Sequence, residues 1–246
     1  MPASGRLLSI IVPAFNEEKL LPQTLQSLKS ACSVVEERGW SYEIIVCDNN
    51  STDATGEIAR QSGAKVVFEP VNQIARSRNS GAAAAAGDWF LFIDADSELT
   101  PGLLGETLDA MVQPDIIGGG STICLDSSEL LPRILSFCWN SYSRLRTLMA
   151  GSYIFCCAQA FKLAGGFPLE YFVAEELYFA LRLKEVARQQ GKRLVILHRH
   201  PLKTSARKMK LYSKTDFLRL LLRAAKTRGK AWQQREACHP WYDGRR

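Results

Sequence analysis

Long uncharged stretches are scarce in this sequence. The longest, Thr147–Phe161, has 15 residues, which is fewer than the roughly 18 that would suggest a membrane-spanning helix. The N-terminal residues reach Pro13 and two acidic residues too soon to resemble a signal peptide. These two absences argue against a secreted or membrane-spanning protein, and we expect a cytoplasmic one.

Cysteine and histidine motifs are also missing. The chain has seven cysteines, an odd number, and no two of them form a CxxC pair. On a strand, the adjacent Cys156 and Cys157 would point to opposite faces of the sheet. A disulfide framework and a zinc site are therefore disfavoured, and a reducing compartment fits best. His198 and His200 would share one face of a strand, and we expect them to bind no metal.

Two phosphate-binding motifs are absent as well. No G-x-G-x-x-G follows the first apolar run, and no G-x-x-x-x-G-K-[ST] occurs anywhere in the chain. A dinucleotide fingerprint and a P-loop are thereby excluded. Phosphate charge would have to be neutralised by another device, for which paired carboxylates holding a divalent metal are the candidate.

What the sequence does contain is an alternation of strands and helices over its first hundred residues. Apolar runs predict strands at 7–12, 42–47, 65–69 and 89–93. Between them, helices are predicted over 16–31 with Asn16 as N-cap, after a cap at Ser51 or Thr52 as far as Gly63, and over 73–87. This alternation indicates βαβ units and a mostly parallel sheet flanked by helices, which is an α/β fold.

Polar residues follow three of these strands, in PAFNEE after the first, DNNSTD after the second and DADSE after the fourth. Because ligands bind beyond the carboxyl ends of parallel strands, the three segments should meet at one edge of the sheet. Asp94 and Asp96 in particular end a buried strand. Mg²⁺ and similar cations bind through one or two carboxylates and share their other positions with substrate phosphates.

Four stretches resemble the inverting family 2 glycosyltransferases of the GT-A fold: SIIVPAFNEE (9–18), EIIVCDNNSTDAT (43–55), ARSRNSGAAAAAGDWFLFIDADSEL (75–99) and GGFPLEYFVAEELYFALRLK (165–184). Their order makes the resemblance specific, since each alone would be weak. It implies a single GT-A domain over 1–205, with a nucleotide-binding half (1–100) and an acceptor half (101–205). It also implies that a sugar passes from a nucleotide-diphosphate donor to a hydroxyl group.

The resemblance assigns roles to residues of the donor half. The residues implied to bind the nucleotide are Pro13, Ala14, Phe15, Glu17, Asp48, Arg78 and Asp94, with Asn79 supporting the loop near Arg78. Asp94 and Asp96 are implied to hold a Mn²⁺ or Mg²⁺ ion that bridges the diphosphate and neutralises charge on the departing nucleotide. The segment TSARK (204–208) is a further candidate for contact with the diphosphate.

The acceptor half would hold the general base. The family's Glu-Asp motif falls at Glu175-Glu176, and its second acid takes the proton of the acceptor hydroxyl. We expect Glu176 to be this base, although the replacement of Asp by Glu leaves Glu175 as the alternative. The resemblance places Gly151, Gly166 and Phe167 on the acceptor side.

Aromatic residues of the acceptor half are a separate candidate. Trp139 and Tyr142 would be able to stack on a sugar ring, or would belong to the core like most aromatic side chains.

Each of these assignments has a purely structural alternative. Asp94 and Asp96 would be turn residues before a helix that Thr100 caps and Pro101 begins. Asp48 would begin a turn, and Arg78 would be a solvated helix residue.

For the acids of the last motif the structural reading is compatible with the functional one. Glu175 and Glu176 would be first-turn residues favoured by the positive end of a helix, whether or not either is a catalytic base.

The C-terminal residues carry most of the positive charge. Residues 199–246 contain 14 Lys and Arg against 3 Asp and Glu, whereas residues 1–198 contain 17 against 22. Within 206–246 we predict a basic amphipathic helix with Arg219, Arg223, Lys226 and Lys230 on one stripe. It either packs on the domain or lies on an anionic membrane, which would place the protein at the inner face of that membrane. No nucleic-acid-binding motif accompanies the charge.

Two further function classes remain open. A nucleotidyltransferase would need a basic, glycine-rich loop after the first strand, where this chain has the acidic PAFNEE. A non-catalytic nucleotide-sugar-binding or regulatory subunit is favoured by Glu at 176 and disfavoured by the intact pair Asp94 and Asp96. For an enzyme, the acceptor would be a glycan or a lipid-linked molecule with a hydroxyl group.

Overall fold

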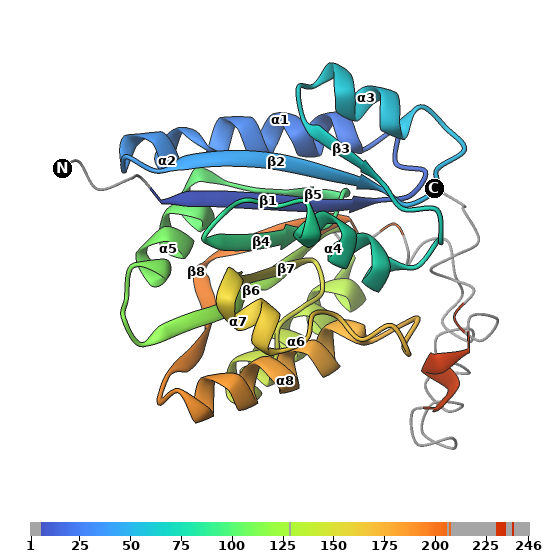
Figure 1. Ribbon diagram of the computed structural model, residues 1–246. Coiled ribbons are helices and arrows are strands. Elements are labelled where there is room, and N and C mark those ends of the chain that lie inside the picture. Colours follow the sequence, from blue (N-terminus) through green and yellow to red (C-terminus); the bar gives the residue numbers. More distant parts are fainter. Residues whose placement is uncertain (1–5, 128, 206, 208–229, 235–237, 239–246) are drawn as a thin grey trace.

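The computed structural model describes residues 6–127, 129–205, 207, 230–234 and 238 (Figure 1). The strands in chain order are β1 (Leu7–Ala14), β2 (Ser41–Asp48), β3 (Lys65–Phe68), β4 (Trp89–Ile93), β5 (Ser97–Glu98), β6 (Ile116–Asp126), β7 (Tyr153–Cys157) and β8 (Arg193–Ser205). The helices are α1 (Leu21–Ala31), α2 (Ser33–Glu37), α3 (Thr55–Gln61), α4 (Ile74–Ala83), α5 (Pro101–Met111), α6 (Leu130–Arg146), α7 (Ala158–Leu163), α8 (Glu175–Gln189) and the 3₁₀ turn η1 (Lys230–Gln233).

The described strands form one sheet in the order β3-β2-β1-β4-β7-β6-β8-β5. Strands β1 to β4 pair in parallel, as does β6 with β8, whereas β7 runs antiparallel to both β4 and β6. The predicted α/β class with a mostly parallel, helix-flanked sheet is therefore confirmed. The antiparallel β7 and the edge strand β5 are additions to that prediction.

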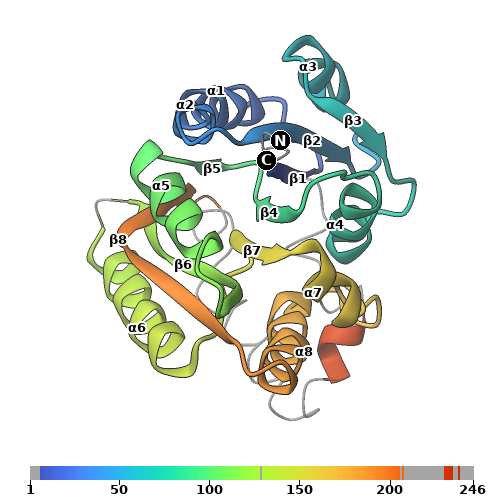
Figure 2. The same cartoon turned by 60° about the vertical axis from the view of Figure 1, so that its left-hand side comes forward.

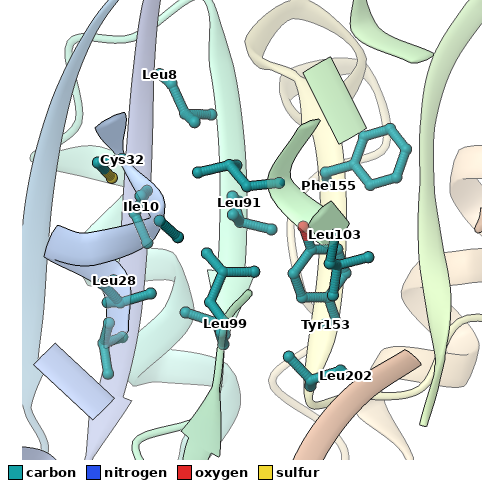
Figure 3. Packing of buried hydrophobic residues seen from close by; sticks show 14 of the residues in the cluster. Leu8, Ile10, Leu28, Cys32, Leu91, Leu99, Leu103, Tyr153, Phe155 and Leu202 are labelled. Carbon is teal, nitrogen blue, oxygen red and sulfur yellow. The ribbon is translucent and has the colours of Figure 1, made fainter. Parts of the chain in front are cut away.

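Two apolar clusters cover the two faces of the sheet. Leucines of α1 and α5 pack on one face, around Leu8, Leu91 and Phe155 (Figure 3). The other face is covered by α4, α7 and α8, whose Phe161 and Phe179 contact Phe92 or one another. These helices lie on opposite sides of the strands in Figures 1 and 2. Strands β1 and β4 are buried because they lie between these two layers. Strand β2 is buried only over its second half, and β3, at the edge of the sheet, has no buried residue.

The starts of two predicted helices are wrong for a shared reason. Asn16 does not cap α1, since it adopts a left-handed φ of 53° and its Oδ1 accepts a hydrogen bond from the Thr52 N–H. Ser51 does not cap α3, because its Oγ accepts from the Asn16 N–H. The helices begin only at Leu21 and Thr55, and the two loops before them bind one another.

The helix predicted over 73–87 ends early, at Ala83. The backbone N–H groups of Ala86 and Gly87 donate instead to Glu43 Oε1 and Ser9 Oγ, at 2.7 and 2.9 Å. A side chain at Gly87 would lie 2.5 Å from Ser9 Oγ. This close approach explains why the turn before β4 has a glycine at position 87.

No helix in the described part of the chain is long and apolar enough to cross a membrane. Most of the predicted basic helix, 206–246, lies outside the described residues. The division into a nucleotide-binding half and an acceptor half stays a prediction.

Candidate active site

One edge of the sheet gathers the strand ends that the sequence singled out. The carboxyl ends of β1 and β2 lie side by side, with Ala14 paired to Asp48. Because β7 is antiparallel to β4, its first residue, Tyr153, pairs with Ile93. The loop before β7 is thereby placed beside Asp94, whose N–H donates to the Ser152 carbonyl at 3.3 Å. Residues far apart in the chain therefore meet at this edge.

Arg78 of α4 is the centre of this arrangement. Its side chain is only 2% exposed, and Nη1 donates to Glu175 Oε1 at 2.6 Å. Nη2 donates to Asp94 Oδ1 at 3.1 Å and to the Gly151 carbonyl oxygen at 2.8 Å. The guanidinium also lies over the Phe167 ring, 5.1 Å from its centroid. Arg78 is thus a buried ion-pair partner, and its reading as a solvated helix residue is wrong.

Glu175 and Glu176 begin α8, directly after Ala174, which adopts a left-handed φ of 66°. Their reading as first-turn acids is confirmed. Burial, followed by repulsion from Glu176, raises the pKa of Glu175 to about 8 against the opposing attraction of Arg78. The one positive charge of Arg78 therefore faces three acids, Asp94, Glu175 and Glu176, and does not neutralise them all.

A pocket of about 290 Å³ opens beside this cluster. Arg78, Asp94, Gly151 and both glutamates line it, together with Trp139 and residues of the loop 172–174. Gly151 is tightly enclosed, because a methyl group there would lie 3.3 Å from Arg78 Nη2 and from the Glu176 carboxyl carbon. In the described part of the chain the buried Trp139 indole N–H has no hydrogen-bond acceptor. The pocket is therefore lined by carboxylates and by one hydrogen-bond donor, the Trp139 N–H, that has no acceptor among the described residues.

A second group of charges lies at the same edge. Arg207, just beyond β8, binds both carboxylate oxygens of Glu17 at 2.8 and 3.0 Å and reaches Asp96 Oδ2 at 3.3 Å. Arg207 belongs to the TSARK segment, and β8 delivers it here because β8 runs parallel to β6. The sequence showed only that this segment is basic, and it did not reveal that Arg207 contacts two of the predicted site acids.

The other residues predicted for the nucleotide lie at the ends of β1 and β2. Pro13 and Ala14 are the last two residues of β1 and are buried, and Phe15 is half-buried. Asp48 is 8% exposed, and its Oδ1 accepts a hydrogen bond from the Ser51 N–H at 3.0 Å. The turn reading of Asp48 is therefore confirmed, and its contact with a nucleobase stays a prediction.

Two residues predicted for the acceptor lie beneath the pocket. Phe167 is 1% exposed, and its backbone is held by the Asn79 side chain through hydrogen bonds at 2.9 Å in both directions. Gly166 has a φ of 67°, and a methyl group there would lie 2.8 Å from Asn79 Oδ1. The Phe167 ring supports Arg78, so an acceptor role for these two residues remains a prediction. Tyr142, paired with Trp139 at 6.3 Å between ring centroids, is half exposed.

Comparison with known protein families identifies the family of this chain. The family described as Glycosyl transferase family 2 matches residues 9–164. The chain belongs to this family. The matched range contains the segments around Asp48, Arg78, Asp94 and Gly151, and it ends before Glu175.

Two curated relatives are similar to this family 2 member over less than half of its length. A 4,4'-diaponeurosporenoate glycosyltransferase of Staphylococcus haemolyticus is 37% identical over 113 residues, which are 43% of this chain and 28% of that protein. A dolichol-phosphate mannosyltransferase of Pyrococcus furiosus is 30% identical over 121 residues, 46% of this chain and 32% of that protein. The chain spans between 23% and 41% of the length of the curated relatives it matches.

Solved structures share the fold of this family 2 chain. S. aureus TarS (residues 1–349) has a TM-score of 0.64 at 21% identity, over 82% of this chain and 61% of that one. Glucosyl-3-phosphoglycerate synthase from Mycobacterium tuberculosis, in complex with Mn²⁺, UDP and glucosyl-3-phosphoglycerate, has a TM-score of 0.62 at 22% identity. That alignment covers 89% of this chain and 77% of the synthase.

The residues present fit a metal that protein and substrate hold jointly. Within the described residues no three side chains of His, Cys, Asp or Glu come together as a preformed metal cage. Asp94 and Asp96 supply hard carboxylate oxygens at the end of β4, which is the donor set that Mg²⁺ uses when phosphates complete its coordination. His198 and His200 lie on β8 and are exposed, and the His200 ring faces Glu106 at 3.4 Å.

Proposed function

We propose that this chain transfers a sugar from a nucleoside diphosphate sugar to a hydroxyl group, with inversion at the sugar carbon. Membership of family 2 supports the reaction class. The observation that carries the proposal is the pocket in which Glu176, Asp94 and Trp139 surround a space large enough for a hydroxyl-bearing ligand.

Glu176 is the residue we assign as general base. Glu175 is committed to Arg78 through a 2.6 Å ion pair and is only 4% exposed at its side chain. Glu176 is half-buried, lines the pocket and lies against Gly151. A base has to reach the acceptor hydroxyl directly or through one water. In this reading Glu175 holds Arg78 and the start of α8 in place, while Glu176 removes the proton.

The donor half would bind the nucleotide with Pro13, Ala14, Phe15, Glu17 and Asp48. Asp94 and Asp96 would hold Mn²⁺ or Mg²⁺, which would neutralise charge on the departing nucleoside diphosphate as a Lewis acid. The synthase structure with UDP and Mn²⁺ makes UDP the first nucleotide to test.

Arg207 is the residue we assign to the diphosphate itself. Its guanidinium already lies among acids of the donor edge, 3.3 Å from Asp96 Oδ2. Arginine binds phosphate oxygens through the same fork geometry with which it binds carboxylates. When a diphosphate enters, Arg207 would exchange a carboxylate partner for phosphate oxygens.

The acceptor stays open between a glycan and a lipid-linked molecule. Trp139 is suited to either, because its ring presents an apolar face and its N–H a donor. Similarity to a dolichol-phosphate mannosyltransferase favours testing a lipid-linked acceptor early.

Thermal stabilisation tests the donor site. We expect UDP or a UDP-sugar to raise the melting temperature in the presence of Mn²⁺, since a ligand at a hundredfold excess over its Kd adds about 2.7 kcal/mol. Asp96→Ala should abolish the metal-dependent part of this shift, whereas Asp109→Ala, an acid on the exposed side of α5, should retain it. If no nucleoside diphosphate gives a metal-dependent shift, the donor site is wrongly assigned.

Turnover tests the base. With a donor identified, hydrolysis or transfer should fall by at least about a hundredfold in Glu176→Gln, while nucleotide stabilisation persists. Glu185→Gln removes an exposed acid of the same helix and should leave turnover unchanged. If turnover instead falls about a hundredfold in Glu175→Gln and is unchanged in Glu176→Gln, the base is Glu175. Binding without turnover in the wild type would support the non-catalytic alternative.

A further inference from the structure

Helix α6 is oriented with its apolar side away from the protein. Among the side chains of α6 that the structure describes, the buried ones are Pro132, Ser136 and Ser143. Asn140 fastens it to β6, because its amide donates to the Ile123 carbonyl at 2.8 Å and accepts from the Ile123 N–H at 2.9 Å. The described attachment of α6 therefore combines these polar contacts with the buried Pro132 and the half-buried Trp139.

The opposite side of α6, which we call its outer face, consists of large apolar side chains. Leu145 is 81% exposed, Phe137 72% and Leu130 71%. Ile134, Leu135 and Tyr142 are 46–49% exposed, and Leu130, Ile134 and Phe137 recur at the three- and four-residue spacing of one helical stripe. A surface helix normally buries such a stripe, and a contiguous exposed one marks an interaction surface. Figure 2 shows α6 at the periphery of the molecule, on the far side of β6 and β8 from the core.

The charges on α6 are all of one sign. Arg133, Arg144 and Arg146 are exposed beside the apolar stripe, and residues 130–146 contain no Asp or Glu. Glu129 and Asp126 are acidic but precede the helix. The partner that complements this surface is apolar in its interior and negatively charged where it meets the arginines.

We propose that the outer face of α6 binds the surface of an anionic lipid bilayer. Helices of this type lie in the plane of the interface, with apolar side chains among the acyl chains and basic side chains at the headgroups. A second copy of the chain would bring arginines against arginines. Residues 199–246 of the same chain, with 14 basic residues against 3 acidic ones, would also add positive charge to positive charge. An anionic bilayer complements both parts of the surface, because its acyl chains contact the apolar stripe and its headgroups contact the arginines.

This surface also has a defined relation to the pocket. Trp139, on the inward side of α6, lines the pocket between α6 and α8. A bilayer bound to the outer face would therefore lie about one helix diameter, ~10 Å, from the pocket wall. The inference does not depend on the proposed function, since lipid binding needs neither a donor nor a metal.

Vesicle co-sedimentation of the full chain tests the proposal. The probes are vesicles of phosphatidylcholine alone and of phosphatidylcholine mixed with phosphatidylglycerol, at low and high salt. We expect binding to the mixed vesicles that weakens with salt. The variant Phe137→Ser/Leu145→Ser should bind about tenfold more weakly, because it removes two side chains that would insert. Arg133→Gln/Arg144→Gln should weaken the preference for phosphatidylglycerol.

The matched control is Leu163→Ser/Leu181→Ser, which removes two leucines of α7 and α8 that are also more than half exposed. It should bind like the wild type. Circular dichroism and urea titration establish that each variant is folded. Absence of vesicle binding in the wild type, or unchanged binding in Phe137→Ser/Leu145→Ser, would overturn the proposal. So would a dimer of the wild type that this variant converts to a monomer, since the face would then be a protein interface.

Discussion

Replacing Arg78 by methionine should destabilise the protein more than any other single charge removal in the described structure. The side chain is 2% exposed, and its two terminal nitrogens serve Glu175, Asp94 and the Gly151 carbonyl. Methionine fills much of the volume but leaves Glu175, whose side chain is 4% exposed, and Asp94, whose side chain is 25% exposed, without their cation. Breaking a buried ion pair from one side costs about 3–5 kcal/mol, most of which is the penalty for the unpaired charge that remains.

Urea unfolding at about pH 9, above the pKa of about 8 that Glu175 has in the folded protein, measures this loss with both acids ionised, and two further variants make the result interpretable. Arg38→Met breaks an ion pair with Asp109 in which the two side chains are 37% and 68% exposed, so it should cost about 0–1 kcal/mol. Arg78→Met/Glu175→Gln should be more stable than the sum of the single changes predicts, by about 1–3 kcal/mol, since the neutral amide no longer needs the cation. A loss below about 1 kcal/mol in Arg78→Met, or strict additivity with Glu175→Gln, would refute the view that Arg78 holds the site together.

Three other changes test single contacts. Because burial raises the pKa of Glu175 from 4.5 to about 8, the folded protein retains a proton that the unfolded chain releases, so stability should fall as pH rises from 4.5 to 8. Glu175→Gln should flatten this slope in urea titrations across that range, and an unchanged slope would contradict the assignment. Asn140→Leu leaves the Ile123 N–H and carbonyl without partners and should cost about 1–3 kcal/mol for each, measured by urea unfolding. Thr100→Ala removes the cap of α5, a 3.2 Å hydrogen bond from the Leu103 N–H, and should lower the unfolding free energy by about 1 kcal/mol. Equal stability of wild type and variant would show that the N–H is satisfied otherwise.

The sheet was predictable where burial alone decides the structure. The runs at 7–12 and 89–93 are apolar on both faces because helices cover both, and such runs predict strands without further information. The start of α1 was not predictable, since Asn16 is a good helix cap in isolation. It binds Thr52 instead, a residue of another loop, and long-range contacts of this kind are invisible to a local pattern.

The candidate site divides in the same way. Asp94 and Asp96 were recognisable because two acids at the end of a buried strand are costly without a positive partner. The identity of that partner was not recognisable, because Arg78 reaches Asp94 through the packing of α4 against the sheet, and Arg207 reaches Asp96 through the pairing of β8 with β5. Pairing of distant strands, including the reversed direction of β7, is set by tertiary packing that the spacing of residues does not reveal.

The Arg78 cluster has a consequence for the exchange of segments between related proteins. Arg78 lies on α4, in the first hundred residues, whereas Gly151 and Glu175 come from the later part of the chain. A chimera joined after β4 would inherit the arginine from one parent and its acceptors from the other. It would fold well only when the second parent supplies a carboxylate at 175 and permits a glycine-sized residue at 151. In evolutionary terms, recombination at this junction is restricted to parents that share both features, however different their other residues are.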